Sequence, residues 1–324
     1  MSNRKGVFWK DRKVLITGHE GFLGSWLAKV LLGYGARITG IDKIKNRPVS
    51  MLNGLRKDIT CVRGDIINLE LVKNVIERFK PQTIFHLAAE AIVLEANKNP
   101  IKTFKSNIEG TWNILEASRN KKFIESIVIA SSDKAYGETN KLPYKEDAPL
   151  SGNHPYDASK SCADLLAHTY YNTYNLPVGI TRCGNVFGPG DFHFSRIAPD
   201  AIRSALQNRK LLIRSDGRFT RDYVYVEDIM NGYILLAENL QRLKLEGEAF
   251  NFSNEKPVSV IKMVKKIYQL AGIRPSYKIL SKVRHEIRHQ HLSSWKARKA
   301  LGWKPKHSLE EGLKKTINWY KGIF

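Results

Sequence analysis

Short apolar runs alternate with longer amphipathic stretches between residues 13 and 182 of the chain. The apolar runs are typical of buried strands, and we expect strands at 13–17, 37–41, 60–63, 83–86, 126–130 and 179–182. Apolar residues three and four positions apart predict amphipathic helices at 25–32, 69–79, 101–118 and 157–174. This alternation predicts an α/β fold with a doubly wound parallel sheet, in which ligands bind at the carboxyl ends of the strands.

The pattern becomes looser after Gly188-Pro-Gly190. Helical spacing recurs at 196–207, 226–238, 259–271 and 309–319, with short strands between these stretches. We therefore expect a smaller, mostly helical C-terminal lobe that binds the substrate. The predicted division is 1–185 for the nucleotide-binding domain and 186–324 for this lobe, with an interleaved boundary.

The first strand leads into a glycine-rich turn. Gly18, Gly21 and Gly24 have the spacing G-x-x-G-x-x-G, and a helix is expected directly after them. Glycine allows the tight reversal and lets the backbone approach a pyrophosphate, while the helix N-terminus offers free N–H groups. The turn, with Phe22 and Leu23 inside it, predicts a Rossmann-type cofactor site.

Asp42, at the end of the second strand, bears on which cofactor binds. A carboxylate there accepts hydrogen bonds from the adenosine ribose and repels a 2′-phosphate, so NAD is favoured over NADP. Lys43 and Arg47 leave the alternative open, because a cation could receive that phosphate. Asp42 could also be a solvated strand end.

Composition excludes several classes of protein. The chain has 324 residues, 42% of them hydrophobic, and no apolar run long enough to span a membrane. We read no secretory signal at the N-terminus. Cys61, Cys162 and Cys183 lack metal-ligand spacing, so we expect reduced thiols, no metal site and a cytoplasmic location.

The chain is strongly basic, with 53 Lys and Arg residues against 31 Asp and Glu residues and a net charge of +22. The lysines are spread along the whole chain, and we recognise no nucleic-acid motif. We therefore expect no nucleic-acid partner. A basic surface would also attract an anionic nucleotide substrate, and generic composition is the simpler explanation.

The candidate chemistry follows the fifth expected strand, where Ser132, Asp133 and Lys134 stand in sequence. Tyr156 and Lys160 lie four residues apart and share one face of a predicted helix. We expect the Lys160 ammonium and a cationic nicotinamide to lower the pKa of the Tyr156 phenol, so that it accepts a proton from an alcohol. Ser132 would hydrogen-bond the same oxygen. Alone, a Tyr-x-x-x-Lys pair is usually surface decoration.

Together these segments resemble the extended short-chain dehydrogenase/reductase superfamily, in its nucleotide-sugar-modifying branch. The resemblance covers most of the chain and is carried by Thr17-Gly-His-Glu-Gly-Phe-Leu-Gly24, Gly64-Asp65-Ile66, Phe85-His-Leu-Ala-Ala89, Asn107-Ile-Glu-Gly-Thr111, Tyr156-Asp-Ala-Ser-Lys160, Arg182-Cys-Gly-Asn185 and Arg221-Asp-Tyr-Val-Tyr-Val-Glu-Asp228.

The resemblance implies roles for further residues. It places Asp65 and Ile66 by the adenine, Asn107 behind the catalytic helix, and a homodimer interface on 101–118 and 157–174. It implies that Leu87, Ala88 and Ala89 lie along the cofactor, that Asn185 and Arg221 bind the substrate phosphates, and that Arg196 also contacts the nucleotide sugar. His285 and Arg288 are expected at its phosphates or ribose, although their cluster could equally be a solvated basic loop. Arg221 could instead form a salt bridge with Asp222 or Asp228.

Within the superfamily, the chain is most similar to CDP-glucose 4,6-dehydratases, through the glycine-rich turn, Ser132-Asp133-Lys134 and Arg196-Ile-Ala-Pro-Asp200. It departs from them at Arg221-Asp-Tyr-Val-Tyr-Val and at Glu90, where that family usually has Gln. The resemblance implies that Tyr156 takes the proton of the sugar's 4-hydroxyl, Lys134 takes the carbon-5 proton, and Asp133 protonates the departing 6-hydroxyl. A 4-epimerase or 4-reductase that uses Tyr156 and Lys160 alone is the alternative, and a nucleotide sensor without turnover is another.

Overall fold

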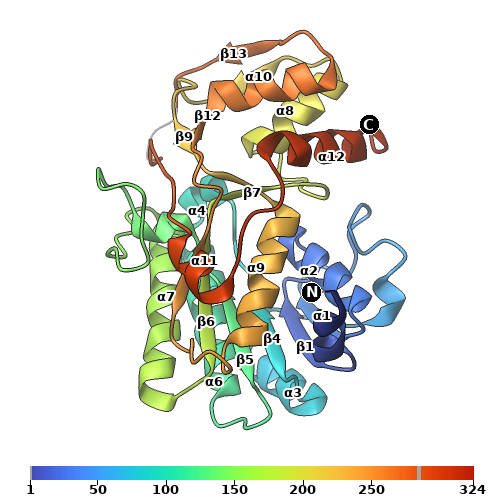
Figure 1. Cartoon of the computed structure of the whole chain (residues 1–324), viewed down its shortest axis with the longest axis vertical. Coiled ribbons are helices and arrows are strands. Elements are labelled where there is room, and N and C mark those ends of the chain that lie inside the picture. Colours follow the sequence, from blue (N-terminus) through green and yellow to red (C-terminus); the bar gives the residue numbers. More distant parts are fainter. Residues whose placement is uncertain (1, 283–285) are drawn as a thin grey trace.

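The computed structural model describes residues 2–282 and 286–324 and has two parts, a sheet domain and a lobe beside it (Figure 1). The sheet domain contains a seven-stranded sheet in the order β11-β6-β5-β4-β1-β2-β3, in which every pairing is parallel. Its strands are β1 (Lys13–Thr17), β2 (Arg37–Asp42), β3 (Ile59–Arg63), β4 (Thr83–His86), β5 (Ser126–Ala130), β6 (Val178–Cys183) and β11 (Ala249–Phe252). The order reverses between β1 and β4, so the predicted doubly wound α/β fold is confirmed.

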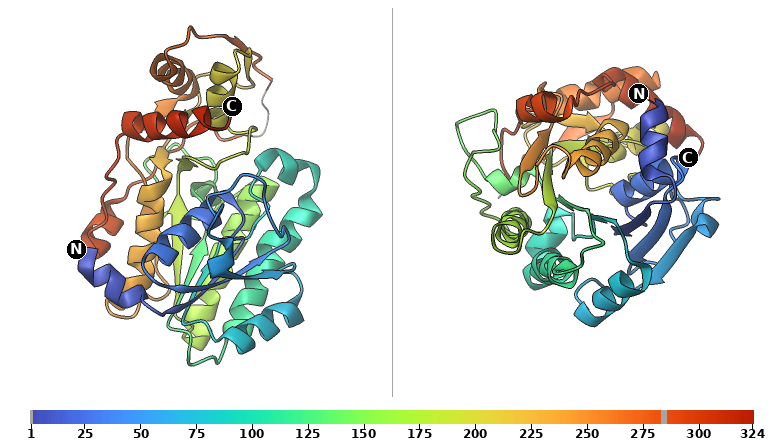
Figure 2. Two further views of the ribbon diagram at one scale, coloured as in Figure 1. Left: turned by 90° about the vertical axis from the view of Figure 1, so that its right-hand side faces the viewer. Right: turned by 60° about the horizontal axis from the view of Figure 1, so that its bottom comes forward.

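The strands are apolar along their length because both faces of the sheet are covered. In β1, Val14 and Ile16 face one hydrophobic core, whereas Leu15 faces the other. On the first face lie α2 (Phe22–Gly33) and α9 (Val226–Asn239), which pack against each other. The second face carries α3 (Leu69–Phe79), α6 (Gly110–Ser118) and α7 (Pro155–Tyr174) (Figure 2). The predicted helix positions are therefore close to those observed.

The stretch 101–118, predicted as one helix, is divided into three parts. It contains α5 (Pro100–Phe104), a π-helical turn (Lys105–Glu109) and α6, and it follows the short helix α4 (Val93–Lys98). A π turn adds one residue to a helical turn and often occurs at functional sites. Here it carries Asn107, one of the predicted cofactor residues.

An N-terminal helix, α1 (Ser2–Trp9), was not predicted. Trp9 is fully buried against the sheet, where its ring lies 6.1 Å from that of Phe85. Its indole N–H donates to the Glu238 carboxylate at 2.6 Å. These contacts are with residues far along the chain, so local periodicity does not reveal them.

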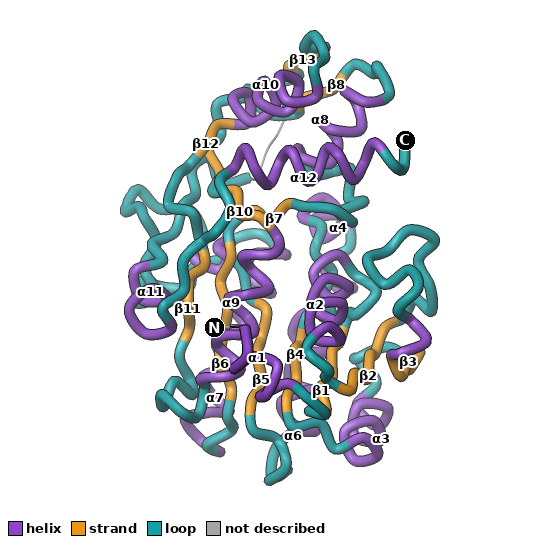
Figure 3. The backbone as a smooth tube through the Cα atoms, turned by 45° about the vertical axis from the view of Figure 1, so that its right-hand side comes forward, coloured by secondary structure: helices purple, strands orange, loops and turns teal. Residues whose placement is uncertain are grey.

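The chain returns to the sheet domain after residue 186. β11 pairs with β6, α9 covers the sheet, and α11 (Trp295–Leu301) packs against β11 (Figure 3). The division at residues 185 and 186 stays a prediction, and these crossings show how its two sides interleave.

The lobe combines helices with two-stranded ribbons. Its helices are α8 (Ile197–Leu206), α10 (Val260–Ala271) and α12 (Leu309–Lys321). Its ribbons pair β7 (Asn185–Phe187) with β10 (Tyr223–Tyr225), β8 (Leu211–Ile213) with β13 (Tyr277–Ile279), and β9 (Thr220–Arg221) with β12 (Val258–Ser259). In the part of the chain that the structure describes, no helix has the length and apolar character needed to cross a membrane.

Candidate active site

A cavity of about 620 Å³ lies between the carboxyl ends of the sheet strands and the lobe. Both parts of the molecule contribute to its lining, which is the position expected for a ligand in a doubly wound sheet. The predicted residues that line it are Leu23, Leu87, Ala89, Ser132, Asp133, Lys134, Tyr156, Lys160, Asn185, Arg196 and Arg221.

The glycine-rich turn has the close backbone packing that the sequence predicts. Gly18 has φ of +72°, and a Cβ atom there would lie 2.9 Å from the Cα atom of Ala88. A Cβ atom on Gly24 would overlap the carbonyl oxygen of Gly18. Gly21 caps α2 without a side-chain hydrogen bond, so the first turn of the helix opens on bare backbone. This cradle fits a dinucleotide pyrophosphate.

Three predicted cofactor residues near the cradle, Phe22, Leu23 and Asp42, have different surroundings. The Phe22 side chain belongs to the hydrophobic core, so only its backbone belongs to the turn, whereas Leu23 lines the cavity. The Asp42 carboxylate accepts hydrogen bonds from the backbone N–H groups of Glu20 and Ile44, each at 3.0 Å. The strand-end carboxylate is therefore held in place, and its contact with a ribose stays a prediction.

The cation beside Asp42 has acidic partners of its own. The Lys43 ammonium lies 3.1 Å from the Asp65 carboxylate and 3.9 Å from that of Glu90. Asp65 thus anchors Lys43, and Ile66 packs into the second core beneath it. This ion pairing supports the preference for NAD, because Lys43 is already occupied by two carboxylates.

Asn107 links the backbone at Glu90 to α7, the helix that carries Tyr156 and Lys160. Its amide donates to the Ser159 hydroxyl on α7 at 2.8 Å, and its oxygen accepts from the Glu90 backbone N–H at 2.8 Å. Asn107 therefore contacts α7, and its predicted role at the cofactor site stays a prediction. In the adjoining strand end, the Leu87 and Ala88 N–H groups each donate to the Thr17 hydroxyl at 3.2 Å.

Ser132, Asp133 and Lys134 begin a short 3-10 helix, Asp133–Tyr136, directly after β5. The Ser132 hydroxyl donates to Asp133 at 3.1 Å and accepts from the Lys134 backbone N–H at 3.2 Å. Burial raises the pKa of Asp133, against the opposing charge of Lys134. Burial lowers the pKa of Lys134, and the nearby Arg221 charge lowers it further. Each group is thereby shifted toward its neutral form.

Tyr156 and Lys160 lie on α7 and line the same cavity. Desolvation raises the pKa of Tyr156 to about 12 despite opposing effects of Arg196 and Ser132. The expected lowering, which requires a cationic nicotinamide beside the phenol, stays a prediction. The Lys160 ammonium donates to the Ala130 carbonyl at 2.7 Å and lies 6.0 Å from the centre of the Tyr156 ring. Burial lowers the pKa of Lys160 to about 8.

The predicted substrate residues are brought together only in part. Asn185, Arg196 and Arg221 line the cavity. The Arg288 side chain is exposed and does not line it, whereas its backbone carbonyl accepts from Arg221 at 3.0 Å. The prediction for Arg288 as a side-chain contact is therefore not supported by the cavity. His285 lies outside the described residues.

Arg221 has a partner that the sequence did not reveal. Its guanidinium is buried and lies 2.7 Å from the Glu286 carboxylate. The alternative of a salt bridge to Asp222 or Asp228 is therefore wrong. Asp228 instead accepts hydrogen bonds from the backbone of Lys306 at 2.9 Å.

A second missed residue is Gln290, whose side-chain oxygen accepts from the Lys134 ammonium at 3.0 Å. Gln290 stands 156 positions after Lys134 and is fully buried. Its neighbours in sequence carry no motif for this contact, so nothing in the local pattern indicates it.

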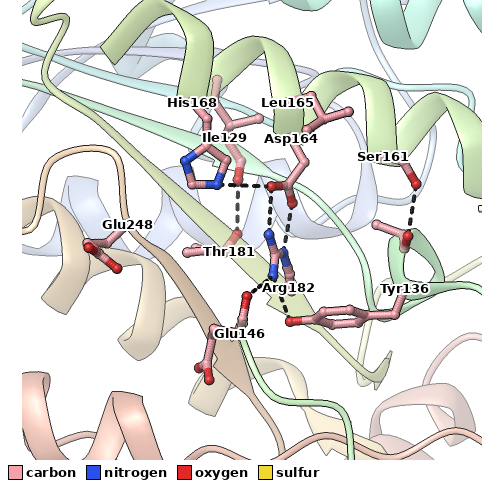
Figure 4. A network of polar contacts seen from close by, with 12 residues as sticks. Ile129, Tyr136, Glu146, Ser161, Asp164, Leu165, His168, Thr181, Arg182 and Glu248 are labelled. Atoms are coloured by element: carbon pink, nitrogen blue, oxygen red, sulfur yellow. Dashed lines mark hydrogen bonds and ion pairs between the residues drawn. The ribbon is translucent and has the colours of Figure 1, made fainter. Parts of the chain in front are cut away.

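A buried polar network is centred on Arg182 (Figure 4). The Arg182 guanidinium donates two hydrogen bonds to Asp164 on α7, at 2.8 and 2.7 Å, and one to the Tyr136 hydroxyl at 2.8 Å. It also donates to the Glu146 carbonyl at 3.0 Å. The network joins β6, α7 and the 3-10 helix that carries Asp133 and thereby fixes these elements relative to one another.

The fold and the site together define a nucleotide-binding enzyme of the short-chain dehydrogenase/reductase type. Residues 15–316 match the family described as GDP-mannose 4,6 dehydratase, so the chain belongs to this family. It is 34% identical to a CDP-glucose 4,6-dehydratase from Salmonella typhimurium, over 97% of this chain and 92% of that protein. It is 31% identical to a UDP-glucuronate 4-epimerase from Thermodesulfobacterium geofontis, over 95% of each chain.

Among solved structures, a dTDP-glucose 4,6-dehydratase from Streptomyces venezuelae superimposes with a TM-score of 0.88 at 26% identity. The match covers 96% of this chain and 97% of that one, and that enzyme was solved with NAD bound. The chain is therefore closely similar in fold to a dehydratase, and a UDP-glucuronate 4-epimerase is also among its relatives.

Proposed function

We propose that the protein is an NAD-dependent 4,6-dehydratase that converts a nucleotide-activated hexose, CDP-glucose first among the candidates, to its 4-keto-6-deoxy form. The observation that carries this proposal is the buried Asp133 and the partly buried Lys134 beside Tyr156 in one cavity. The similarity of the chain to a CDP-glucose 4,6-dehydratase supports the choice of nucleotide.

NAD is the cofactor that the cradle and its surroundings fit. Gly18, Gly21 and Gly24 would receive the pyrophosphate, and Asp42 the ribose, with Asp65 and Ile66 near the adenine. Bound NAD⁺ would supply a reversible hydride acceptor at carbon 4 and return the hydride to carbon 6. Because it ends as it begins, no external reductant is required.

The proton steps fall to the chain's own residues. Tyr156 would take the proton of the 4-hydroxyl, with Ser132 hydrogen-bonded to the same oxygen. A cationic nicotinamide near the phenol would oppose the effect of burial on the Tyr156 pKa. The resulting 4-ketone makes the carbon-5 hydrogen acidic, and Lys134, shifted toward the neutral amine, would remove it. Asp133, shifted toward the protonated acid, would donate to the departing 6-hydroxyl, which leaves as water. Protonated Lys134 would then return a proton to carbon 5 as the hydride reaches carbon 6.

The substrate would lie across both parts of the molecule. Asn185, Arg196 and Arg221 line the lobe side of the cavity and suit the phosphates of a nucleotide sugar. We propose the division into a 1–185 domain and a 186–324 lobe on the same basis, since the sugar would then lie between them.

The test of the reaction is to incubate the protein with CDP-, dTDP-, UDP- and GDP-hexoses without added reductant and to follow the products by mass spectrometry. Loss of the mass of one water from one substrate would establish both dehydration and the nucleotide. Unchanged mass from all four would contradict the proposal.

The role of Lys134 is tested separately by Lys134→Met. We expect the variant to lose exchange of the carbon-5 hydrogen with solvent, followed by NMR in deuterated water. Lys262→Met, at an exposed position on α10, is the matched control and should exchange normally. Undiminished exchange in Lys134→Met would remove Lys134 from the role of base.

A 4-epimerase is the second candidate, because a UDP-glucuronate 4-epimerase is among the relatives. It would use Tyr156 and Lys160 but leave the 6-position unchanged. Its products have the mass of the substrate and an inverted carbon 4, which NMR distinguishes from the dehydratase product.

A further inference from the structure

We propose that Gln290 is a positioning residue for Lys134, an uncharged acceptor that orients its amine toward the substrate. The proposal rests on the proposed function, because it assigns a partner to the base of that reaction. It is carried by the geometry of the segment that follows residue 285.

Gln290 is held rigidly on both sides. Its backbone N–H donates to the Thr220 carbonyl at 3.2 Å, while the next residue, His291, accepts from the Tyr144 backbone N–H at 3.0 Å. Its side chain is fully buried, and its oxygen accepts from the Lys134 ammonium at 3.0 Å. A buried side chain on a pinned backbone has little rotamer freedom, so it fixes where the Lys134 nitrogen lies.

The amide of Gln290 is unusual in another respect. Among the described residues its nitrogen, also buried, has no hydrogen-bond partner. A buried donor without a partner costs free energy, so an apolar residue would pack more favourably unless the amide oxygen has a use. The contact with Lys134 is such a use.

The chemistry of an amide suits this position. A neutral primary amine has two N–H donors and one lone pair, and a general base must direct that lone pair at the substrate. An acceptor that binds one N–H orients the nitrogen. A carboxylate would also orient the nitrogen, but it would strongly stabilise the ammonium form. An uncharged amide stabilises the ammonium form far less.

Four charged groups act on Lys134, from different parts of the chain. Asp133 adjoins it in the 3-10 helix, Asp157 lies on α7, Arg221 on β9, and Glu286 on the same segment as Gln290. Arg221 lowers the Lys134 pKa, while the three carboxylates raise it. A fourth carboxylate at the position in direct contact would act strongly against the neutral amine.

The test compares Gln290→Glu with Gln290→Met by trace labelling with acetic anhydride across a range of pH. Mass spectrometry of the Lys134 peptide gives the pH at which the amine becomes reactive. We expect this midpoint to rise by roughly one to three pH units in Gln290→Glu, as for an amine gaining an adjacent opposite charge. It should fall in Gln290→Met, because the charged form loses an acceptor.

Opposite displacements are the signature of positioning, since a purely structural disturbance has no reason to change sign with the charge. Gln269→Glu, the same substitution at an exposed site on α10, should leave the midpoint unchanged. Coincident midpoints in the wild type and both variants, or shifts in one direction, would overturn the proposal. If Gln290→Glu does not fold, an unchanged midpoint in Gln290→Met alone overturns it.

Catalysis gives a second readout. In Gln290→Glu, the acid limb of the kcat profile should move to higher pH by the same interval as the labelling midpoint. Labelling needs no turnover, so the two proposals can fail separately. Inactivity with every nucleotide sugar would contradict the proposed function, and the labelling midpoints would still decide the role of Gln290.

Discussion

The side chains of Asp133 and Lys134 line the same cavity, and removal from water acts on their ionisation in opposite senses. A carboxyl group removed from water is harder to ionise, and an ammonium removed from water is harder to keep charged. Their mutual attraction opposes both shifts, but desolvation is the largest cause in each case. Two adjacent residues can thus provide an acid and a base at one pH, as removal of water requires.

Asp222, next to Arg221, offers a test of the same physics through stability. Burial raises its pKa to about 7, so the folded state binds a proton more tightly than the unfolded chain does. Its contribution to stability is therefore full below about pH 4 and is lost as the pH rises toward 7. In Asp222→Asn this loss is absent. We therefore compare the free energy of unfolding of the variant with that of wild type. The difference, variant minus wild type, should increase by about 1 to 4 kcal/mol when the pH is raised from 4.5 to 8.

Urea denaturation at both pH values measures this difference. The Asn amide retains an oxygen for the Ser253 hydroxyl and the Leu292 N–H, which both bond to Asp222. Asp147→Asn, at an exposed position, is the control and should show a difference that does not change with pH. A constant difference for Asp222→Asn as well would contradict the raised pKa.

Single residues were predictable where chemistry follows local spacing. Tyr156 and Lys160 share a helix face, and Ser132 follows a strand, so both observations are available from nearby sequence. Gln290 and Glu286 were missed because their contacts join residues 156 and 65 positions apart. The effect of burial on the Tyr156 pKa was not predicted, because the extent of that burial depends on packing that the sequence does not specify locally.

At the scale of elements, strands buried on both faces were the easiest to predict. β1, β4 and β5 have the predicted bounds because an unbroken apolar run ends where burial ends. β11 was not predicted as part of the sheet, since its short run is recognisable as a sheet strand only once β6 lies beside it. The π turn in 101–118 was missed because helical periodicity passes through it almost unchanged.

The turn before α2 makes a prediction about an element. A methyl group on Gly24 would overlap the Gly18 carbonyl, so Gly24→Ala must displace the cradle. We expect NAD affinity to fall at least tenfold, equivalent to about 1.4 kcal/mol, as measured by calorimetry. Gly33→Ala, on the same helix with nothing within 4 Å, is the control and should bind NAD normally while gaining about 0.5 to 1 kcal/mol of stability. Equal affinities for both variants would contradict a cradle formed at Gly24.

The Arg182 network predicts how elements are tied together. Arg182→Leu leaves the Asp164 carboxylate buried without its cation, which costs about 3 to 5 kcal/mol of stability. The double variant with Asp164→Leu should be less destabilised than Arg182→Leu, because no unpaired charge remains. Chemical denaturation measures both. Arg37→Leu removes the exposed pair with Asp11 and should cost no more than about 1 kcal/mol. Additive losses in the double variant would contradict a coupled pair.

At the scale of the whole molecule, the helices on the second face of the sheet leave apolar side chains in water. Ile101 on α5 is 72% exposed, Trp112 on α6 42% and Leu165 on α7 55%. Both α5 and α6 pack against α7, so these residues lie on neighbouring helices. Exposed apolar residues gathered on adjoining elements are typical of an interface. We propose that a second copy of the chain covers them, which is the homodimer that the family resemblance implies.

Trp112→Glu tests this assembly, because the substitution removes a large aromatic ring from the interface and places a charge there instead. Aromatic anchors typically contribute about 2 kcal/mol or more to association, so dimerisation should weaken by at least thirtyfold. Light scattering after size-exclusion chromatography would show a dimer for wild type and a smaller species for the variant at the same concentration. Trp295→Glu, on α11 at the other side of the sheet domain and 59% exposed, should stay dimeric. A monomeric wild type would contradict the interface. Equal dissociation in both variants would also contradict it, because the proposed interface includes Trp112 on α6 but not Trp295 on α11.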